Sequence, residues 1–348
     1  MRNKWRRSNV RMPQKNTRGE HTVRLVTFEQ AGKAKVGCLL TGDRVLDLAD
    51  AYKLTKNHDR DSFSSMLALI EDGESALEAA QGLIDNPPAE ALLALSEVRL
   101  LAPIPRPPRL RSMSSYPAHL QRAQEGRARL EARSEVDPEA AFELAKTKFV
   151  KRPPKGYYQT PIYWLMDHYC VSGPEDEIVW PAYSEWIDYE LELVAVIGKG
   201  GSDIKKEQAE QHIFGYTLLN DLSARDEQAL ASATSLSITA KGKDFHGAYP
   251  MGPCIVTRDE IDIYALDASL RVNGVEWASA STANPQWTFA DCIAYASRAA
   301  TLIPGEMISS ATVANCSGLE QARKGSIGDI VELHVAPIGV LRNKIVAA

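Results

Sequence analysis

Three acidic residues alternate with apolar residues in the stretch IDYELELVAVIG, which covers residues 187–198. Asp188, Glu190 and Glu192 are separated by single residues, and an uncharged run follows them. Because side chains at i, i+2 and i+4 of a strand share a face, neighbouring carboxylates would lie roughly 6–7 Å apart at their roots. Two such glutamates could converge on one hard cation such as Mg²⁺. A half-exposed strand with a solvated acidic face is the alternative that this stretch leaves open.

Two further stretches carry residues that could take part in the same chemistry. In GYTLLNDLSARDEQ, Asp221 follows an apolar strand and could supply a third oxygen ligand. Arg225 and Gln228, a few residues on, offer hydrogen-bond donors for a developing oxyanion. Lys243 follows a glycine in AKGKDF and could neutralise an enolate, although a solvated loop lysine is the commoner case. Each signal is weak by itself, since Asn-Asp is also a common turn pair.

The composition of the 348 residues is that of an ordinary globular protein, with 44% hydrophobic and 24% charged residues. The net charge of −5 argues against nucleic acid or an anionic membrane as the main partner. No apolar run approaches the ~20 residues that a membrane-spanning helix needs. Five widely spaced cysteines without a CxxC pair favour reduced thiols in a cytoplasmic protein over a disulfide framework or a zinc site.

The first 20 residues carry seven Lys/Arg and one acid, and they lack the apolar core of a signal peptide. We expect a disordered basic tail there, with a transit peptide or a start site assigned too early as alternatives. Residues 22–50 read as short strands, and residues 62–101 are apolar at helical spacing. Four prolines between residues 102 and 110 then indicate a domain boundary.

We therefore expect a small N-terminal α/β domain over residues 21–105 and a metal-dependent catalytic domain over residues 106–348. Within the second domain, residues 119–150 indicate two charged helices broken at Asp137-Pro138. Strand-rich sequence follows, with short helices expected at 205–213 and 288–299.

Taken in order, these motifs resemble the fumarylacetoacetate hydrolase family. DYExE, NDxSARDxQ, GKxF with GP downstream, and PGE before an S-G-T-like strand end follow one another in the family's order. The resemblance covers roughly residues 106–343. It implies an α+β, strand-rich fold, namely a mixed β-sandwich roll with short helices, and an assembly as a homodimer. The N-terminal strands are similar to the small β-rich domain that precedes the catalytic domain in some members.

By similarity, Glu190, Glu192 and Asp221 are the carboxylates that bind Mg²⁺, or Mn²⁺ or Ca²⁺ in its place. Asp188 is then the preceding acid of the strand and not a ligand. Some members use a further aspartate, but this chain has Ser112 near that point. We therefore expect a site of three carboxylates that water and substrate oxygens complete.

The resemblance also assigns the acid–base residues. His119 in SSYPAHLQRA matches the family's general base, and an imidazole can take a proton from water at neutral pH. Short members orient this histidine with a glutamate three residues on, where this chain has Arg122. Glu320 in CSGLEQ fits the orienting role found in larger members, so we expect a His119–Glu320 dyad.

Residues around the substrate follow from the same resemblance. Lys243 is expected as a catalytic donor, with Arg225 and Gln228 binding substrate oxygens. Thr312 matches the S-G-T threonine, but Ala311 replaces the glycine before it, and a positive φ there would cost strain.

Two segments bear on what fits the pocket. Residues 157–169 match the substrate-lining strand, in which Trp164 and Met166 depart from the commoner family residues. Residues 122–150 would form a lid, with an ordinary solvated hairpin as the alternative.

The implied reaction is hydrolysis of a C–C bond in a small-molecule 2,4-diketo acid, such as an acylpyruvate or a fumarylacetoacetate-like compound. The metal would hold the enolate, and His119 would activate the water that attacks the distal carbonyl. Relatives with the same metal site decarboxylate or isomerise 2-oxo acids instead, and a non-catalytic homologue is a third interpretation. The effect of His119→Ala would separate the two enzyme classes.

Overall fold

The computed structural model describes residues 22–234 and 239–348 as an α+β, strand-rich protein with short helices, which confirms the expected fold class. The basic tail expected over residues 1–20 lies outside these described residues. None of the described helices is long and apolar enough to cross a membrane.

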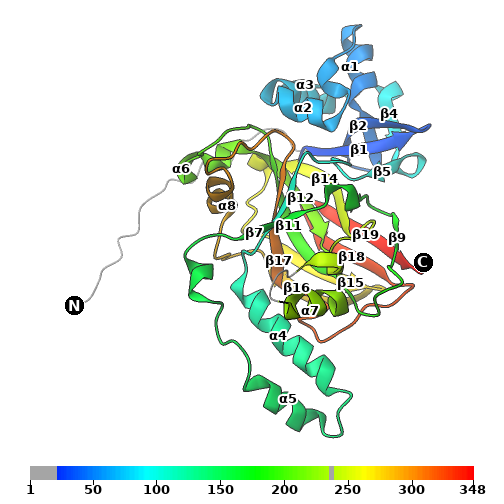
Figure 1. Cartoon of the computed structure of the whole chain (residues 1–348). Coiled ribbons are helices and arrows are strands. Elements are labelled where there is room, and N and C mark those ends of the chain that lie inside the picture. The colour runs from blue at the N-terminus through cyan, green and yellow to red at the C-terminus, as the bar shows by residue number, and fades with distance from the viewer. Residues whose placement is uncertain (1–21, 235–238) are drawn as a thin grey trace.

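A large mixed sheet runs through the molecule, and a second, five-stranded sheet packs beside it (Figure 1). The large sheet has the order β4-β3-β2-β1-β14-β12-β11-β17-β6-β7, with β5 pairing with β1 and β8 with β14. The second sheet has the order β16-β15-β18-β19-β9, and β10 pairs with β13. The strands are β1 (Arg24–Gln30), β2 (Lys33–Leu40), β3 (Arg44–Asp47), β4 (Leu92–Ala94), β5 (Arg99–Leu101), β6 (Leu110–Met113), β7 (Tyr163–Met166), β8 (Val171–Ser172), β9 (Glu177–Val179), β10 (Ile187–Asp188), β11 (Glu190–Ile197), β12 (Ile213–Asn220), β13 (Ser223–Ala224), β14 (Tyr249–Thr257), β15 (Asp267–Val272), β16 (Val275–Ser281), β17 (Met307–Ser317), β18 (Ile330–Val335) and β19 (Gly339–Val346). The helices are α1 (Leu48–Lys56), α2 (Met66–Asp72), α3 (Glu74–Asp85), α4 (Pro117–Ala132), α5 (Pro138–Lys146), α6 (Lys206–Ala209), α7 (Arg225–Ala233) and α8 (Phe289–Ala296).

The N-terminal segment contains the three expected strands but differs from the prediction at two places. The strand in RVLDLADA ends at Asp47, because that carboxylate accepts hydrogen bonds from the N–H groups of Ala49 and Asp50 and so caps α1. Residues 88–101, which read as helical, instead contain β4 and β5, which pair with β3 and β1. Non-local pairing has overridden helical spacing here.

Strands from both sides of residue 105 share the large sheet, because β1 also pairs with β14. The division of the chain at residue 105 stays a prediction. In Figure 1 the N-terminal helices α1 to α3 form a separate layer at the top of the molecule.

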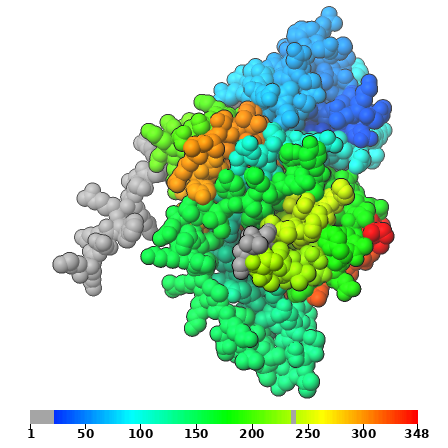
Figure 2. All heavy atoms as spheres, viewed as in Figure 1, coloured from blue at the N-terminus to red at the C-terminus, as the bar shows by residue number. Residues whose placement is uncertain are grey.

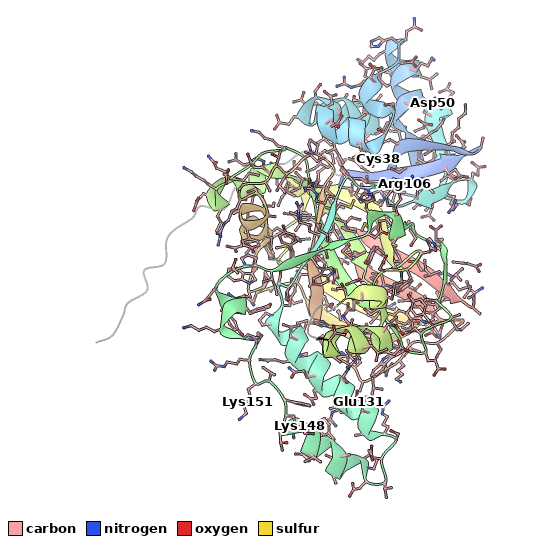
Figure 3. The ribbon with its side chains drawn as sticks, in the orientation of Figure 1. Cys38, Asp50, Arg106, Glu131, Lys148 and Lys151 are labelled. Atoms are coloured by element: carbon pink, nitrogen blue, oxygen red, sulfur yellow. The ribbon has the colours of Figure 1, made fainter. Side chains whose placement is uncertain are left out.

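Helices α4 and α5 form a charged hairpin that projects from the body of the protein (Figures 1 and 2). Asp137 begins α5 by accepting a hydrogen bond from the N–H of Ala140 at 3.1 Å, and a proline follows it. A small apolar core of its own, centred on Phe142, holds the two helices together. Figure 3 shows exposed charged residues along this hairpin, namely Glu131, Lys148 and Lys151.

Strand β11 lies in the middle of the large sheet, and all eight of its residues are buried. It pairs antiparallel with β12 on one side and with β17 on the other. The pairing with β17 shifts register between Glu190 and Glu192, and again between Glu192 and Val194. Such irregularities re-aim side chains and are frequent beside active sites.

Candidate active site

Glu190, Glu192 and Asp221 form a buried carboxylate cluster at the start of β11. Their exposed fractions are 3%, 1% and 1%, and one oxygen of each lies within 4.8 Å of the others. The backbone N–H of Asp221 donates to the carbonyl oxygen of Glu190 at 3.0 Å, which brings the end of β12 against β11. Asn220 accepts a hydrogen bond from the N–H of Glu190, also at 3.0 Å. The solvated acidic face that the sequence left open is therefore wrong.

The cluster has the properties of a site for a hard divalent cation. All of its donors are carboxylate oxygens, the ligands that Mg²⁺, Mn²⁺ and Ca²⁺ prefer. Oδ1 of Asp221 is buried and has no hydrogen-bond partner among the described residues. Burial and the neighbouring charges of Asp221 and Glu190 raise the pKa of Glu192 well above its ordinary value. A bound cation would satisfy the free oxygen and favour the ionised form of Glu192.

Lys243 and Ser309 hold the carboxylates in place. The buried Nζ of Lys243 donates to Oε2 of Glu190 and to Oδ2 of Asp221, both at 2.5 Å. Burial lowers the pKa of Lys243, but Asp221 and Glu190 outweigh that effect, so the pKa is raised and the amine is a cation. The hydroxyl of Ser309, on β17, donates to Glu192. Sequence reasoning missed Ser309, although it begins the SSAT segment that ends at Thr312.

Asp188 is the counter-ion of Arg225. Nε and Nη2 of Arg225 donate to Oδ2 of Asp188 at 2.8 and 2.6 Å, and Nη2 also donates to Glu190. The N–H of Leu319 donates to the other Asp188 oxygen at 2.9 Å. Gln228 accepts a hydrogen bond from Nη1 of Arg225 at 2.6 Å. Arg225, expected at the substrate, is thus already engaged by two buried carboxylates.

His119 lies near the start of α4, between two carboxylates. Its Nε2 is 3.4 Å from Oε1 of Glu190, and its Nδ1 is 3.2 Å from Oε2 of Glu320. Burial would lower the pKa of His119, but the two glutamates outweigh it and raise the pKa to about 10. Glu320 itself accepts hydrogen bonds from the N–H of Asn315 at 2.8 Å and the hydroxyl of Ser317 at 3.0 Å. The structure therefore brings the predicted dyad together, and its catalytic role stays a prediction.

Two of the departures from the family pattern, Arg122 and Ala311, lie near this dyad. Nη1 of Arg122 donates to Oδ1 of Asn315 at 3.2 Å, so this side chain braces the loop that holds Glu320. Ala311 has a φ of 66°, which is the left-handed conformation that the family's glycine would adopt freely. The anticipated strain is thus present and costs roughly 1–2 kcal/mol for an L-residue. Thr312, the next residue, pairs with Glu192 across the β11–β17 ladder.

A cavity of about 610 Å³ opens onto the cluster beneath α4 and α7. Nine of the ten predicted site residues line it, and the tenth, Glu320, lies behind His119. The nine are His119, Trp164, Glu190, Glu192, Asp221, Arg225, Gln228, Lys243 and Thr312. The wall also contains residues that the sequence did not single out, including Leu120, Arg127, Tyr157, Ile162 and Leu319. None of these was named individually, although Leu120 and Leu319 stand beside His119 and Glu320, and the expected substrate-lining and lid segments contain the others.

Known proteins resemble this chain in sequence over most of its length. The family model for the fumarylacetoacetate (FAA) hydrolase C-terminal region matches residues 116–346. The oxaloacetate tautomerase fahd2, mitochondrial, of Xenopus laevis is 30% identical over 334 residues, which are 93% of this chain and 91% of that protein.

Two solved structures share the fold. Fumarylacetoacetate hydrolase from psychrophilic Exiguobacterium antarcticum has a TM-score of 0.68 and 25% identity, covering 94% of this chain and 100% of that one. Maleylpyruvate hydrolase from Sphingobium sp. SYK-6, in complex with manganese(II) ion and pyruvate, has a TM-score of 0.66 and 23% identity, covering 93% and 99%. The family model spans well over half of the chain, and the Xenopus relative matches nearly all of it. The chain therefore belongs to the fumarylacetoacetate hydrolase family, a superfamily of enzymes.

Proposed function

We propose that this protein is a divalent-metal-dependent enzyme that interconverts the keto and enol forms of a 2-oxo acid. One observation carries the proposal: His119 lies 3.4 Å from Glu190 of the carboxylate cluster, and both line one cavity. Tautomerisation needs a polarised 2-oxo group and one group that moves a proton, and these residues supply both. The full-length relative from Xenopus laevis, called an oxaloacetate tautomerase, supports this choice over the C–C hydrolysis that the sequence favoured.

Glu190, Glu192 and Asp221 would hold the divalent ion. When bound, this ion supplies Lewis-acid polarisation of the 2-oxo group. Mg²⁺, Mn²⁺ and Ca²⁺ all suit a carboxylate donor set, and the manganese(II) and pyruvate of the maleylpyruvate hydrolase structure support a divalent ion near a 2-oxo acid.

His119 would move the proton. In the enol-to-keto direction its imidazolium gives a proton to C3 of the enol, and the enol hydroxyl returns a proton to the imidazole. Substrate and product are isomers, so atoms and electrons balance without a co-reactant. With Glu190 and Glu320 as its charged neighbours, His119 has a pKa of about 10, so the imidazolium is the starting form at neutral pH. A cation held by Glu190 would offset that carboxylate and bring the pKa of His119 closer to neutrality.

Lys243 and Gln228 would position the substrate. The ammonium of Lys243 lies at Glu190 and Asp221, where it can also donate to an enolate oxygen. Gln228 uses its carbonyl oxygen for Arg225, which turns its amide N–H groups into the donors that a substrate can meet.

Hydrolysis of a 2,4-diketo acid is the second candidate, and the pairing of His119 with Glu320 favours it. A carboxylate that orients a histidine and stabilises its protonated form is the arrangement that activates water. Tautomerisation as proposed also uses the proton on His119, so His119→Ala would impair both reactions and would not separate them. The two reactions should instead depend differently on Glu320.

The test is to follow the loss of enol absorbance with oxaloacetate and with a panel of 2,4-diketo acids, in Mg²⁺, in Mn²⁺ and in EDTA, with analysis of the products. Metal-dependent enol loss above the spontaneous rate, without new carbon fragments, would establish a tautomerase. Glu192→Gln should abolish it, and Glu320→Gln should reduce it only modestly. Metal-dependent formation of two fragments from a diketo acid would establish the hydrolase instead. No acceleration with any substrate, despite measurable Mg²⁺ binding, would refute both.

A further inference from the structure

We infer that Arg127 selects 2-oxo acids that carry a second carboxylate, because its guanidinium is placed to pair with the far end of the substrate. The inference rests on the proposed function, since it assigns the other end of the same substrate.

The charges of the cavity wall single out this residue. Four basic residues line the cavity, and three of them, Arg225, Lys243 and His119, lie within ion-pair distance of Glu190. Within the described part of the chain, no carboxylate oxygen lies within 4.0 Å of the nitrogens of Arg127. Among the described residues, Arg127 is therefore the cavity cation that no carboxylate pairs within 4.0 Å.

The surroundings of Arg127 make an anion favourable there. Its side chain is half-buried, its Nη2 donates to the backbone oxygen of Arg225 at 3.2 Å, and its guanidinium carbon lies 5.3 Å from the ring centroid of Trp186. Burial lowers the pKa of Arg127, only partly opposed by Glu131, and the charge of Arg225 lowers it further. The group remains a cation, since arginine does not deprotonate in proteins. A partly desolvated cation without a carboxylate partner is costly, and a ligand carboxylate would reduce that cost through charge-assisted hydrogen bonds.

The position of Arg127 fits the far end of a short dicarboxylate. His119 and Arg127 lie on the same helix, eight residues apart, which separates their backbones by ~12 Å along the axis. The Arg127 side chain reaches back to the backbone of Arg225, whose own guanidinium contacts Glu190. Its charge thus lies roughly one arginine side chain away from the carboxylate cluster. A short 2-oxo dicarboxylate held at the cluster by its oxo-acid end would extend toward this guanidinium.

The experiment compares two ligands of equal chain length. Binding of 2-oxoglutarate and of 2-oxopentanoate, which lacks the second carboxylate, would be measured by calorimetry with Mg²⁺ present. The proteins would be wild type, Arg127→Ala, Arg127→Lys and Arg133→Ala. Arg133 lies at the end of the same helix, is exposed and lines no part of the cavity, so its substitution removes the same charge without touching the site.

We expect wild type to prefer the dicarboxylate and Arg127→Ala to lose about 10- to 100-fold in affinity for it, with 2-oxopentanoate changed less than about threefold. Arg127→Lys should restore part of the preference, and Arg133→Ala should keep all of it. An equal loss for both ligands, or no loss, would overturn the inference.

Turnover of oxaloacetate, measured separately, distinguishes this inference from the proposed function. A ligand preference that depends on Arg127 without turnover would leave the selection intact and refute the tautomerase. Turnover of oxaloacetate without a ligand preference that depends on Arg127 would support the tautomerase and overturn the selection by Arg127.

Discussion

Gly126 allows α4 to pack directly on the loop that carries Glu320, and replacing it with alanine should separate the dyad. A Cβ at position 126 would lie 1.7 Å from the backbone oxygen of Leu319 and 3.3 Å from Cα of Glu320. Both of these neighbours are backbone, so they cannot turn aside as the end of a flexible side chain would. The helix or the loop must therefore move.

The size of the movement follows from this contact. An ordinary contact begins at about 3.4 Å, so the pair must separate by roughly 1.7 Å. Nδ1 of His119 and Oε2 of Glu320, now 3.2 Å apart, would then lie beyond hydrogen-bond reach if α4 moves as a unit. Misplacement of about 1 Å can cost on the order of 100-fold in rate. The loss in the free energy of unfolding should be smaller than the overpacking cost alone. Overpacking costs ~1–3 kcal/mol, while Gly→Ala in a helix stabilises by ~0.5–1 kcal/mol.

The assay is kcat and KM on the substrate that the panel identifies, together with thermal unfolding. Gly82→Ala is the matched control, since Gly82 lies in helix α3 and an added Cβ would have no neighbour within 4 Å. We expect Gly126→Ala to lower kcat about 100-fold, because α4 also carries His119, whose distances to Glu190 and Glu320 would both change, with Mg²⁺ affinity unchanged. Gly82→Ala should leave kcat and Mg²⁺ affinity unchanged and raise the free energy of unfolding slightly. Wild-type kcat and unfolding temperature in Gly126→Ala would refute the packing argument.

Three further predictions concern the buried charges and thiols. Burial raises the pKa of Asp221 to about 6, so protons compete with the metal ion for this carboxylate below pH 6. The affinity for Mg²⁺ should therefore fall up to ~10-fold per pH unit in that range. Equal affinity at pH 5 and pH 7, measured by calorimetry, would contradict this. Asp188→Asn should cost ~3–5 kcal/mol in urea unfolding, because it leaves the buried charge of Arg225 with only Glu190; a loss under about 1 kcal/mol would show that the pair matters little. All five cysteines are buried, and burial raises their pKa to about 11 for Cys38 and about 12 for the others. At pH 8 the native thiols are therefore protonated and should not react with Ellman's reagent, whereas the unfolded chain should show five reactive thiols. A native thiol that reacts rapidly would contradict this.

The carboxylate cluster could be anticipated from the sequence because its geometry is local. Alternation along a strand fixes the common direction of Glu190 and Glu192, and an apolar strand that stops at Asn220 predicts a polar strand end for Asp221. The sequence could not separate a buried cluster from a solvated face. That depends on β12 and β17 covering both edges of β11, and neither pairing is visible in the strand itself.

Other features lay beyond sequence reasoning because they depend on distant partners. The helical spacing of residues 88–101 gave way to strand pairing with β3 and β1. Arg225 was expected at the substrate, since its motif position gives no sign that Asp188 would claim two of its nitrogens. Arg127 stands in the charged segment expected as a lid or a solvated hairpin, and nothing in its own sequence shows that the next residue to Gly126, which packs on Leu319, lines the cavity.

The site thus consists of two halves with different structural support. The metal half lies in the central sheet, where every residue of β11 is buried, and should be among the last parts of the protein to open. The proton-transfer half depends on the α4–α5 hairpin, which carries His119 and Arg127 and holds itself together with a small core separate from the main one. Arg122 fastens this hairpin to the end of β17, Gly126 packs on the loop that follows, and the strained Ala311 lies within β17. Two of the departures from the family pattern, Arg122 and Ala311, therefore lie where the two halves meet, which is where a change of reaction or substrate would require new geometry while the metal ligands stay unchanged.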